Sequence, residues 1–521
     1  MIVNFKNSSE ELIANSRKIR WSGTLRYPGY RVGGESARAF LEDNTAFGDR
    51  VSKLRGTFAL EYCENSASYI AVDNRADYTV FFHGNKIFTS LLSLLDESHF
   101  TVSQLDLNAV LELMFYGNIY SQRSPVKGVQ RLSGSEYLFW SDGKLTVKKK
   151  AHLIDPITLT DENLNLYDEV NKVFSDMPDR ISLDLTGGGD TRLTIAFLMS
   201  CGKEFEVATT GGDDFPDVII AKRIAAILKK KIHQYVQKLE DVESDLNILL
   251  ELSDGLSNPL LFQRRFRMNA LRRQRGIEHA LSSFGPPKDA YWSFLWPFIG
   301  RQNLNVDQYY WIKLKPHLNN HIFENTAFQP VLSGYRRYII EIISRFERQP
   351  AFLYADAIGY HFNEKLHNIK ENIDQIDTTY LYIEPEVIQA IKNFPTQRQY
   401  NHRFFSDYTT PVCPEVSAIR TDKGLNLLSG FPHNFSNELI SRMEILKKID
   451  RRIRYKLTGK SVKQTADHPA LYNRLKKTTT FREAVHLLQK YNLIAGTVET
   501  IPNGMAGPVL SLCEIVKRLH Q

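Results

Sequence analysis

The sequence predicts an α/β protein with an antiparallel α+β unit at the N-terminus and a parallel-sheet α/β unit with a helical extension after it. Up to about residue 145 the chain reads as short β-rich runs broken by Asn, Ser and Gly. From about residue 165 strand-like and helix-like segments alternate. A chain of 521 residues is too long for one typical core, so we expect separate domains, placed at 1–150 and 165–521.

Four patterns in the N-terminal part predict its elements. The runs GTFALEYCEN and SASYIAVDN are typical of strands. The run YTVFFHGNKIFTS has the form of a hairpin with HGN at its tip, and LNAVLELMFYG is apolar at helical spacing. The polar segment SDGKLTVKKKAHLIDPITLTDEN, residues 141–163, is interpreted as a linker.

The C-terminal part opens with the helical pattern LYDEVNKVFSDM. Three predicted strands follow, separated by helical patterns: ISLDLT, FEVATTG and IHQYVQ. Gly202 is a plausible end for the first intervening helix, and Pro216 lies near the first turn of the second. Such alternation implies a parallel sheet with right-handed crossovers. The remainder of the chain is predicted to be mostly helical.

Composition excludes several classes of protein. With 42% hydrophobic and 24% charged residues, the chain is an ordinary globular sequence. It has no apolar run of the ~18 residues that span a bilayer and no secretory h-region, so we expect a cytoplasmic protein without a membrane partner. A net charge of +7 permits an anionic ligand without demanding nucleic acid. The four cysteines are far apart, which argues against a zinc ribbon or a disulfide framework.

The stretch DLTGGGDTRLT, residues 184–194, lies between a predicted strand and a predicted helix. It therefore falls at the carboxyl edge of the sheet, where ligands of open α/β sheets bind. Glycines let backbone N–H groups approach a phosphate, and Thr186 and Thr191 add hydroxyl donors. Asp190 would repel phosphate directly but suits Mg²⁺ bound to phosphate oxygens. The alternative is a plain turn between strand and helix.

The same residues resemble a known family. LDLTGGGDTR resembles the SGGxDS loop of the PP-loop ATP pyrophosphatases, in the variant found in asparagine synthetases and their relatives. FEVATTGGDDFPDVIIAKRIAAIL is similar to the second strand and helix of that synthetase domain. RGTFALEYCENSASYIAVDNRADYTVFFH and YGNIYSQRSPVKGVQRLSGSEYL resemble its glutaminase-type domain, and YNHRFFSDYTTPVCPEVSAIRTDKG a late segment of polysaccharide-cluster members. The resemblance implies an Ntn-hydrolase-like sandwich followed by a PP-loop domain.

The resemblance also implies a reaction. A ligase of this family uses ATP and Mg²⁺ to adenylate a small-molecule or peptide carboxylate, releases pyrophosphate, and lets an amine displace AMP. Asp190 would bind the metal, and the nucleotide would contact Leu185, Thr186, Gly187, Gly188, Gly189, Thr191, Arg192 and Val207. Arg192 has the alternative of a surface position on the first helical turn. The family pattern gives Asp184, in the preceding strand, no metal role.

The N-terminal part departs from the family. A glutaminase of this class needs a cysteine thiolate on an unblocked first residue, whereas this chain starts with Met1 and its first cysteine is Cys63. Cys63 falls in a predicted strand and is interpreted as a small buried hydrophobe. We therefore expect no glutamine hydrolysis, as in the β-lactam synthetases and lasso-peptide cyclases. Ammonia-dependent amidation of a sugar or amino-acid carboxylate and a nucleotide-binding scaffold remain alternatives.

Other family positions are less regular. In ALSSFGPPKDAYWSF, Asp289 is the candidate for the second metal-binding acid, with a surface loop residue as the alternative. Phe284 stands where cyclising relatives can have a tyrosine, and a phenyl ring cannot transfer a proton. The late catalytic lysine is assigned to Lys456 or Lys460, with Lys463 and a solvated basic face as alternatives.

Two further patterns contain side chains that can bind ligands. QRRFRMNALRRQRG, residues 263–276, carries six arginines that could contact phosphates, an acidic peptide or RNA; we favour a solvated face. His361, Glu364 and His367 do not form HExxH and cannot share one helical face, so no metal site is expected there.

Overall fold

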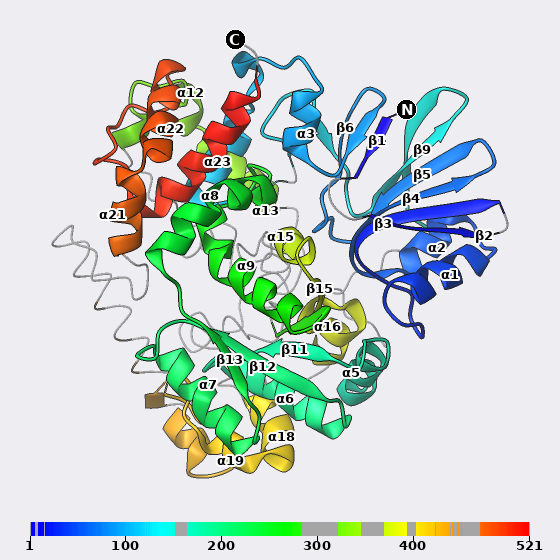
Figure 1. Cartoon of the computed structure of the whole chain (residues 1–521), viewed down its shortest axis with the longest axis vertical. Helices are drawn as coiled ribbons and strands as arrows, with labels where there is room; N and C mark the ends of the chain where they lie inside the picture. Colours follow the sequence, from blue (N-terminus) through cyan, green and yellow to red (C-terminus); the bar gives the residue numbers. More distant parts are fainter. Residues whose placement is uncertain are drawn as a thin grey trace.

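The computed structural model describes residues 2–151 except 6–8, 15, 120 and 122, then 164–283, 321–344, 369–392, 403–437 except 423, scattered positions from 439 to 450, and 469–519. Over these residues the chain is an α/β protein with two largely antiparallel sheets and one parallel sheet. The predicted fold class is therefore confirmed. Figure 1 shows the parallel sheet below the antiparallel sheets, with the C-terminal helices beside them.

The N-terminal unit has four layers. A six-stranded antiparallel sheet has the order β10-β9-β5-β4-β3-β2, and its strands are β2 (Glu10–Ala14), β3 (Arg17–Arg26), β4 (Arg55–Glu64), β5 (Ala67–Val72), β9 (Glu136–Ser141) and β10 (Lys144–Lys149). A smaller sheet has the order β1-β7-β6-β8, with β1 (Ile2–Asn4), β6 (Phe81–His83), β7 (Lys86–Phe88) and β8 (Gln130–Arg131). Only the β1–β7 pair in it is parallel among the described strands.

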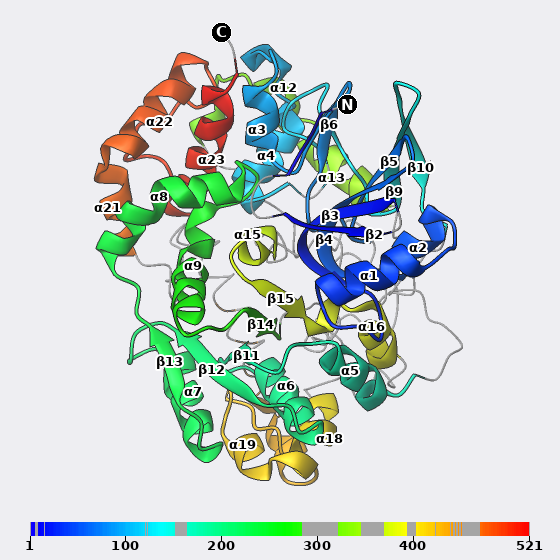
Figure 2. The same ribbon diagram turned by 45° about the vertical axis from the view of Figure 1, so that its right-hand side comes forward.

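Helices cover the outer faces of both sheets. α1 (Gly34–Glu42) and α2 (Phe47–Lys53) lie against the larger sheet (Figure 2). They bury Phe40 and Phe47 together with Trp21 and Tyr62 of that sheet. The other face of that sheet packs on the smaller sheet through residues such as Ile70 and Ile87. α3 (Leu91–Asp96), a short 3₁₀ helix (Val102–Gln104) and α4 (Leu107–Tyr116) form the fourth layer. The predicted hairpin and the helix at LNAVLELMFYG are thus confirmed.

The predicted linker is wrong over its first part. Residues 144–149 form β10, which pairs with β9 across a tight turn at Asp142 and Gly143. Both turn residues have positive φ, 51° and 76°, which suits a two-residue hairpin. The polar run KLTVKK is an edge strand, where lysines are common, and this made it look like a loop in the sequence. Residues 152–163 lie outside the described residues.

The parallel sheet has the order β13-β12-β11-β14-β15. Its strands are β11 (Ile181–Asp184), β12 (Phe205–Thr210), β13 (Ile232–Tyr235), β14 (His279–Ser282) and β15 (Asp377–Tyr380). The three strands predicted from sequence are confirmed, while β14 and β15, which lie in the part predicted to be helical, were missed. α6 (Gly189–Ser200) and α7 (Pro216–Ile227) cover one face, and α9 (Pro259–Gln274) lies on the other (Figure 1).

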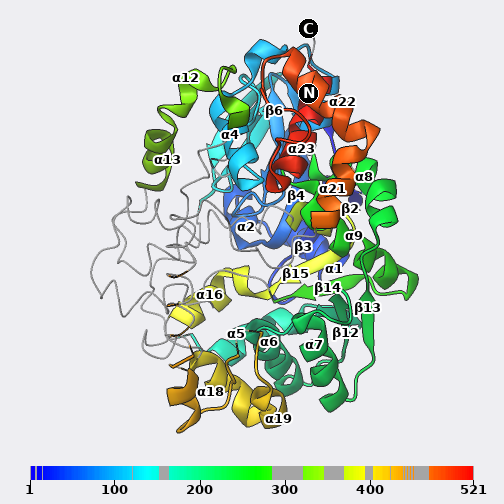
Figure 3. The same cartoon turned by 90° about the vertical axis from the view of Figure 1, so that its left-hand side faces the viewer.

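Further helices extend this unit. α18 (Arg403–Val412) packs on α6, and α19 (Pro414–Ala418) lies near α7, both away from the sheet (Figure 3). The rest are α5 (Leu166–Ser175), α8 (Leu239–Ser253), α12 (Gln329–Leu332), α13 (Tyr335–Ser344), α15 (Ile369–Ile373), α16 (Pro385–Lys392), α21 (Pro469–Lys477), α22 (Thr479–Lys490), α23 (Ala506–Lys517) and short 3₁₀ helices at His321–Phe323, Leu381–Ile383 and Asn503–Met505. Among the described residues, none of the helices has the length and apolar character that crossing a bilayer requires.

The largest hydrophobic cluster joins distant parts of the sequence. It contains Leu111 and Leu113 of α4 together with Leu510 and Leu512 of α23, all fully buried or nearly so. A second cluster joins the β5 face to residues of the β15–α16 region, such as Ile383. Apolar cores thus cross the predicted boundary near residue 150. The division into domains 1–150 and 165–521 stays a prediction.

Candidate functional site

The order of the parallel sheet marks one position on its carboxyl edge. From β11 the chain builds outward through β12 to β13, then returns to add β14 and β15 on the opposite side of β11. The reversal lies between β11 and β14, and open α/β sheets bind ligands in the crevice at the carboxyl ends of two such strands. The glycine loop leaves β11 at this point. The strand order alone therefore places residues 185–189 at the favoured ligand position.

The loop ends directly in helix α6. The helix begins at Gly189, and Gly188 is its N-cap residue with extended geometry, φ −74° and ψ 166°. Glycine has no side chain to accept the N–H groups of the first turn, so the N-cap residue itself leaves these donors without a cap. The start of α6 therefore presents donors and the positive end of a helix dipole at the crevice.

The two predicted hydroxyl donors make contacts within the loop. Thr191 Oγ1 lies 3.2 Å from the carbonyl oxygen of Thr186 and 3.3 Å from that of Gly188. The Gly188 N–H donates to Thr186 Oγ1 at 3.3 Å. Thr191 is buried, whereas Thr186 is exposed. These bonds fix the shape of the loop, and Thr186 is the hydroxyl with access to a ligand.

The three glycines have different surroundings. A Cβ at Gly187 would lie 2.7 Å from Asp217 Oδ1 and 2.9 Å from Ile220 Cδ1. A Cβ at Gly189 would lie 2.6 Å from the Phe405 ring. At Gly188 it would meet, among the described residues, one atom within 4 Å, Thr186 Oγ1 at 3.4 Å, which is an ordinary contact. Packing against described residues explains two of the glycines but not the third, Gly188.

Two charged side chains, the exposed Asp217 and the buried Arg192, hold the loop in place. Asp217 Oδ1, at the start of α7, accepts the Gly187 N–H at 2.9 Å. Arg192 is fully buried, so its alternative surface position is wrong. Its guanidinium donates to the carbonyl oxygens of Gly187 at 3.2 Å and Arg420 at 3.1 Å, and to two carbonyls of α19 and its end. Burial lowers the pKa of Arg192 to about 10, so the group stays charged. Its direct contact with nucleotide stays a prediction.

Asp190 lies half-buried in the first turn of α6. Its carbonyl oxygen accepts from Thr194 Oγ1 at 3.1 Å, and that hydroxyl lies 3.0 Å from the Tyr382 hydroxyl. Burial raises the pKa of Tyr382, and the Asp190 charge adds to this, so the phenol remains protonated. A carboxylate at this position suits Mg²⁺, which commonly takes one or two carboxylates and completes its shell with phosphate oxygens and water.

The other predicted site residues divide into two groups. Leu185 and Val207 are fully buried in the core between the sheet and α6, so only their backbones can contact a ligand. The remainder lie outside the described residues: Asp289, Lys456 and Lys460 of the predicted site, and Phe284, His361, Glu364, His367 and Lys463. Within the part of the chain that is described, no three His, Cys, Asp or Glu side chains gather as a metal site.

The arginine-rich segment is helix α9, and the solvated face we favoured for it is wrong. Arg272 is fully buried, donates to Ser182 Oγ at 3.0 Å, and is paired with Asp184. Arg267 pairs with Asp245 at 2.6 Å, and Arg275 with Glu206 at 2.5 Å. Their partners come from other elements, which the sequence of the segment alone does not reveal.

Asp184 consequently has a structural partner. Burial alone would raise the pKa of this carboxyl, but the charges of Arg272 and Arg265 hold it below its ordinary value of 3.8. Asp184 is therefore ionised and anchors α9 to the end of β11. No sequence pattern predicted that Asp217, Tyr382 and Arg265 lie at this edge, because each reaches it from a separate element. The one local signal was the acidic first turn of α7, after Pro216.

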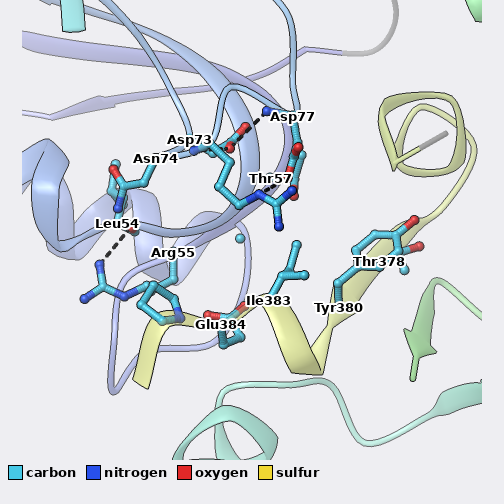
Figure 4. A pocket seen from close by; sticks show the side chains of 13 residues that line it. Leu54, Arg55, Thr57, Asp73, Asn74, Asp77, Thr378, Tyr380, Ile383 and Glu384 are labelled. Carbon is cyan, nitrogen blue, oxygen red and sulfur yellow. Dashed lines mark hydrogen bonds and ion pairs between the residues drawn. The ribbon is translucent and has the colours of Figure 1, made fainter. Parts of the chain in front are cut away.

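A small cavity lies where the N-terminal unit meets the β15–α16 region (Figure 4). Its volume is about 30 Å³, room for one or two water molecules. Asp73, Asn74 and Asp77 line it from one side, and Tyr380 and Glu384 from the other. Burial raises the pKa of Asp77 to about 7. The cavity is too small for a nucleotide.

Comparisons with known proteins find one short sequence match and a weak structural similarity. No family model matches the chain. A stretch of 107 residues is 33% identical to the bifunctional protein HldE of Sulfurimonas denitrificans, which covers 20% of this chain and 22% of that protein. The chain thus spans about a fifth of that relative's length.

One solved structure overlaps a larger share of the chain. It is glutamine phosphoribosylpyrophosphate amidotransferase from B. subtilis, in complex with ADP and GMP. The match covers 55% of this chain and 65% of that one, with 9% identity and a TM-score of 0.18. A superposition at this score says nothing about activity, so the function rests on the residues of the crevice.

Proposed function

We propose that the protein is an ATP-dependent ligase that adenylates a substrate carboxylate, releases pyrophosphate and joins the acyl group to an amine. The observation that carries the proposal is the glycine loop at the reversal point of the parallel sheet. There, helix α6 begins directly after Gly188, which supplies no side-chain cap, and a Cβ at Gly188 would meet one described atom, Thr186 Oγ1, at an ordinary distance. A plain turn needs neither feature, whereas both favour a bound phosphate group.

The residues of the loop have separate tasks in this reaction. The N–H groups at the start of α6 and the Thr186 hydroxyl would bind the β- and γ-phosphates and stabilise the charge of the leaving pyrophosphate. Mg²⁺ held by Asp190 would neutralise part of that charge when bound. Arg192 and Asp217 keep the loop in shape before ATP arrives. Such preorganisation saves the cost of ordering the site during the reaction.

The source of the amine is proposed to be something other than glutamine. Burial raises the pKa of all four cysteine thiols, including Cys63 and Cys201. The pKa values of Cys413 and Cys513 rise to about 11. A thiol nucleophile is active as its thiolate, and these thiols are protonated at neutral pH. The attacking amine is therefore taken to be ammonia or an amine of the substrate itself.

Isotope exchange tests the proposal. The purified protein is incubated with ATP, Mg²⁺, labelled pyrophosphate and a panel of carboxylic acids, and ATP–pyrophosphate exchange is measured. We expect exchange with at least one acid, with AMP rather than ADP formed once an amine is added. With ¹⁸O in the acid, one label should appear in AMP. Label in inorganic phosphate would indicate an acyl phosphate, and ATP binding without exchange would indicate a nucleotide-binding scaffold.

A further inference from the structure

Arg265 projects from α9 to the carboxyl edge of the parallel sheet. Its Nη2 lies 3.5 Å from Asp184 Oδ2 at the end of β11, and its side chain shares a hydrogen bond with the Tyr380 phenol at the end of β15. β14 lies between β11 and β15 in the sheet. The guanidinium therefore spans the end of β14, beside the reversal point.

The direction of α9 supports this placement. Arg275, after its last turn, pairs with Glu206 near the amino end of β12, Arg272 contacts Ser182 within β11, and Arg265 contacts Asp184 at the carboxyl end. The helix thus runs antiparallel to the strands. Its N-terminal half approaches the crevice from the face of the sheet opposite α6 (Figure 1).

Among the described residues, positive charge exceeds negative charge at the end of β11. Asp184 is already paired with Arg272, whose guanidinium is fully buried and also bonded to Ser182 and Asn269. Arg265 adds a second positive charge beside the same carboxylate, at a longer distance. Burial would lower the pKa of Arg265, but Asp184 and Tyr380 raise it, so the group is charged. Its side chain is 33% exposed, which leaves donors available to a ligand.

We propose that Arg265 binds the carboxylate of the acid substrate. The inference rests on the proposed function and adds the residue that recognises the reacting group. The glycine loop holds the pyrophosphate part of ATP from the α6 face, and Arg265 reaches the same crevice from the α9 face. A carboxylate held there by the planar guanidinium is positioned to attack the α-phosphorus. The new bond joins a carboxylate oxygen to phosphorus, and the bond to pyrophosphate breaks.

The test uses the acid that gives the fastest exchange with the wild-type protein. Arg265→Met should raise the KM for that acid about 10- to 100-fold, the range for losing hydrogen bonds to a charged group. The Kd of Mg²⁺–ATP, measured by calorimetry without acid, should stay within about twofold. Arg265→Lys keeps the charge without the planar fork and should recover part of the loss. If Arg265→Met does not fold, the KM of Arg265→Lys for the acid tests the inference instead.

Arg273→Met is the matched control. Arg273 lies on the same helix, about 12 Å farther along it, and donates to Gln375 before β15. This variant should keep the wild-type KM and Kd.

Each other outcome overturns the inference. A weaker Kd for ATP with an unchanged KM for the acid would assign Arg265 to a phosphate of the nucleotide. No change in either constant would leave it as a partner of Asp184 only. If the wild-type protein gives no exchange with any acid, the proposed function fails and this inference fails with it. If exchange occurs and only the Arg265 result is negative, the proposed function stands alone.

Discussion

The Asp217 carboxylate accepts the backbone N–H of Gly187 at 2.9 Å, across 30 residues of sequence. The bond ties the β11–α6 loop to the first turn of α7, so the loop is held by a neighbouring helix as well as by its own threonines. The Gly187 N–H therefore bonds to a group of the protein itself. At Gly188, by contrast, an added Cβ would meet one described atom at an ordinary distance, so a substitution there distinguishes a phosphate cradle from a plain turn by experiment.

The Gly188→Ala variant should fold normally and bind ATP more weakly than the wild-type protein. In the protein alone, the added methyl group makes only an ordinary contact with a described atom, Thr186 Oγ1 at 3.4 Å. A bound phosphate would meet that methyl group, and overpacking of this size costs about 1–3 kcal/mol, or roughly 5- to 150-fold in affinity. Calorimetry with Mg²⁺–ATP and urea unfolding give the two measurements. Gly504→Ala, where the methyl group meets no described atom within 4 Å, is the control. Equal affinities in the two variants would favour the plain turn.

Asp190→Asn should slow adenylation by about 100-fold or more, as when other charge-stabilising groups are removed. The substitution keeps the size of the side chain and removes the charge that suits Mg²⁺. Asp213→Asn is the comparison, because Asp213 is an exposed carboxylate beyond the end of β12 at the same edge of the sheet. Pyrophosphate exchange is measured over a range of Mg²⁺ concentrations. Full activity in Asp190→Asn would contradict the metal assignment.

Arg272→Met should destabilise the fold strongly. It leaves Asp184 with Arg265 as its remaining partner and removes donors to Ser182 and Asn269, and breaking a buried pair typically costs about 3–5 kcal/mol. Arg273→Met removes a surface contact and should cost less than about 1 kcal/mol. Urea unfolding of both variants gives the comparison. Similar stabilities would restore the solvated basic face that the sequence suggested.

Asp377→Asn should change how stability depends on pH. Burial raises the pKa of Asp377 from 3.8 to about 7, the charges of Glu10 and Glu278 add to this, and Thr24 opposes it. The raised value favours the protonated form in the folded state. The stabilisation from Asp377 is therefore fully present below about pH 4 and is lost as pH rises through about 7.

The difference between wild type and variant isolates this contribution. Other buried acids, such as Asp77, titrate in both proteins. In urea unfolding from pH 5 to pH 8, the wild type should lose stability relative to Asp377→Asn. A constant difference across this range would show that Asp377 does not titrate there.

The protein should not release glutamate from glutamine. None of its four thiols is activated, since burial raises the pKa of each. Cys63, the half-buried thiol of β4, lies 3.4 Å from the Ser68 hydroxyl, and burial raises its pKa. Cys63→Ala should keep full turnover, and iodoacetamide at pH 7 should react slowly. Glutamate formation matched to product formation would contradict this.

The sequence predicted the parts of the fold whose signals are local. The strands β11, β12 and β13 alternate with amphipathic helices, and Gly202, in the left-handed region at φ 63°, follows α6 as expected. The strands β14 and β15 have four residues each and are separated from each other by residues 283–376. Burial between neighbours defines them, and those neighbours come from far away in the chain.

The candidate site also has a part that the sequence predicted and a part that it did not. The glycine loop was visible because three glycines in a row between a strand and a helix are a local pattern. The arginines of α9 were misassigned because their partners, such as Asp184 and Glu206, come from β11 and β12. A single sequence shows which charged residues a helix carries, but it does not show which carboxylates they pair with in the fold.

The core shared by α4 and α23 has a consequence for synthesis. The apolar side of α4 leaves the ribosome about 390 residues before α23 does, which at typical elongation rates is a delay of roughly 20 to 80 s. During that time Leu111 and Leu113 lack their final neighbours from α23. The nascent chain therefore exposes the apolar side of α4 until α23 has been made, and a chaperone that shields this side should raise the yield of folded protein.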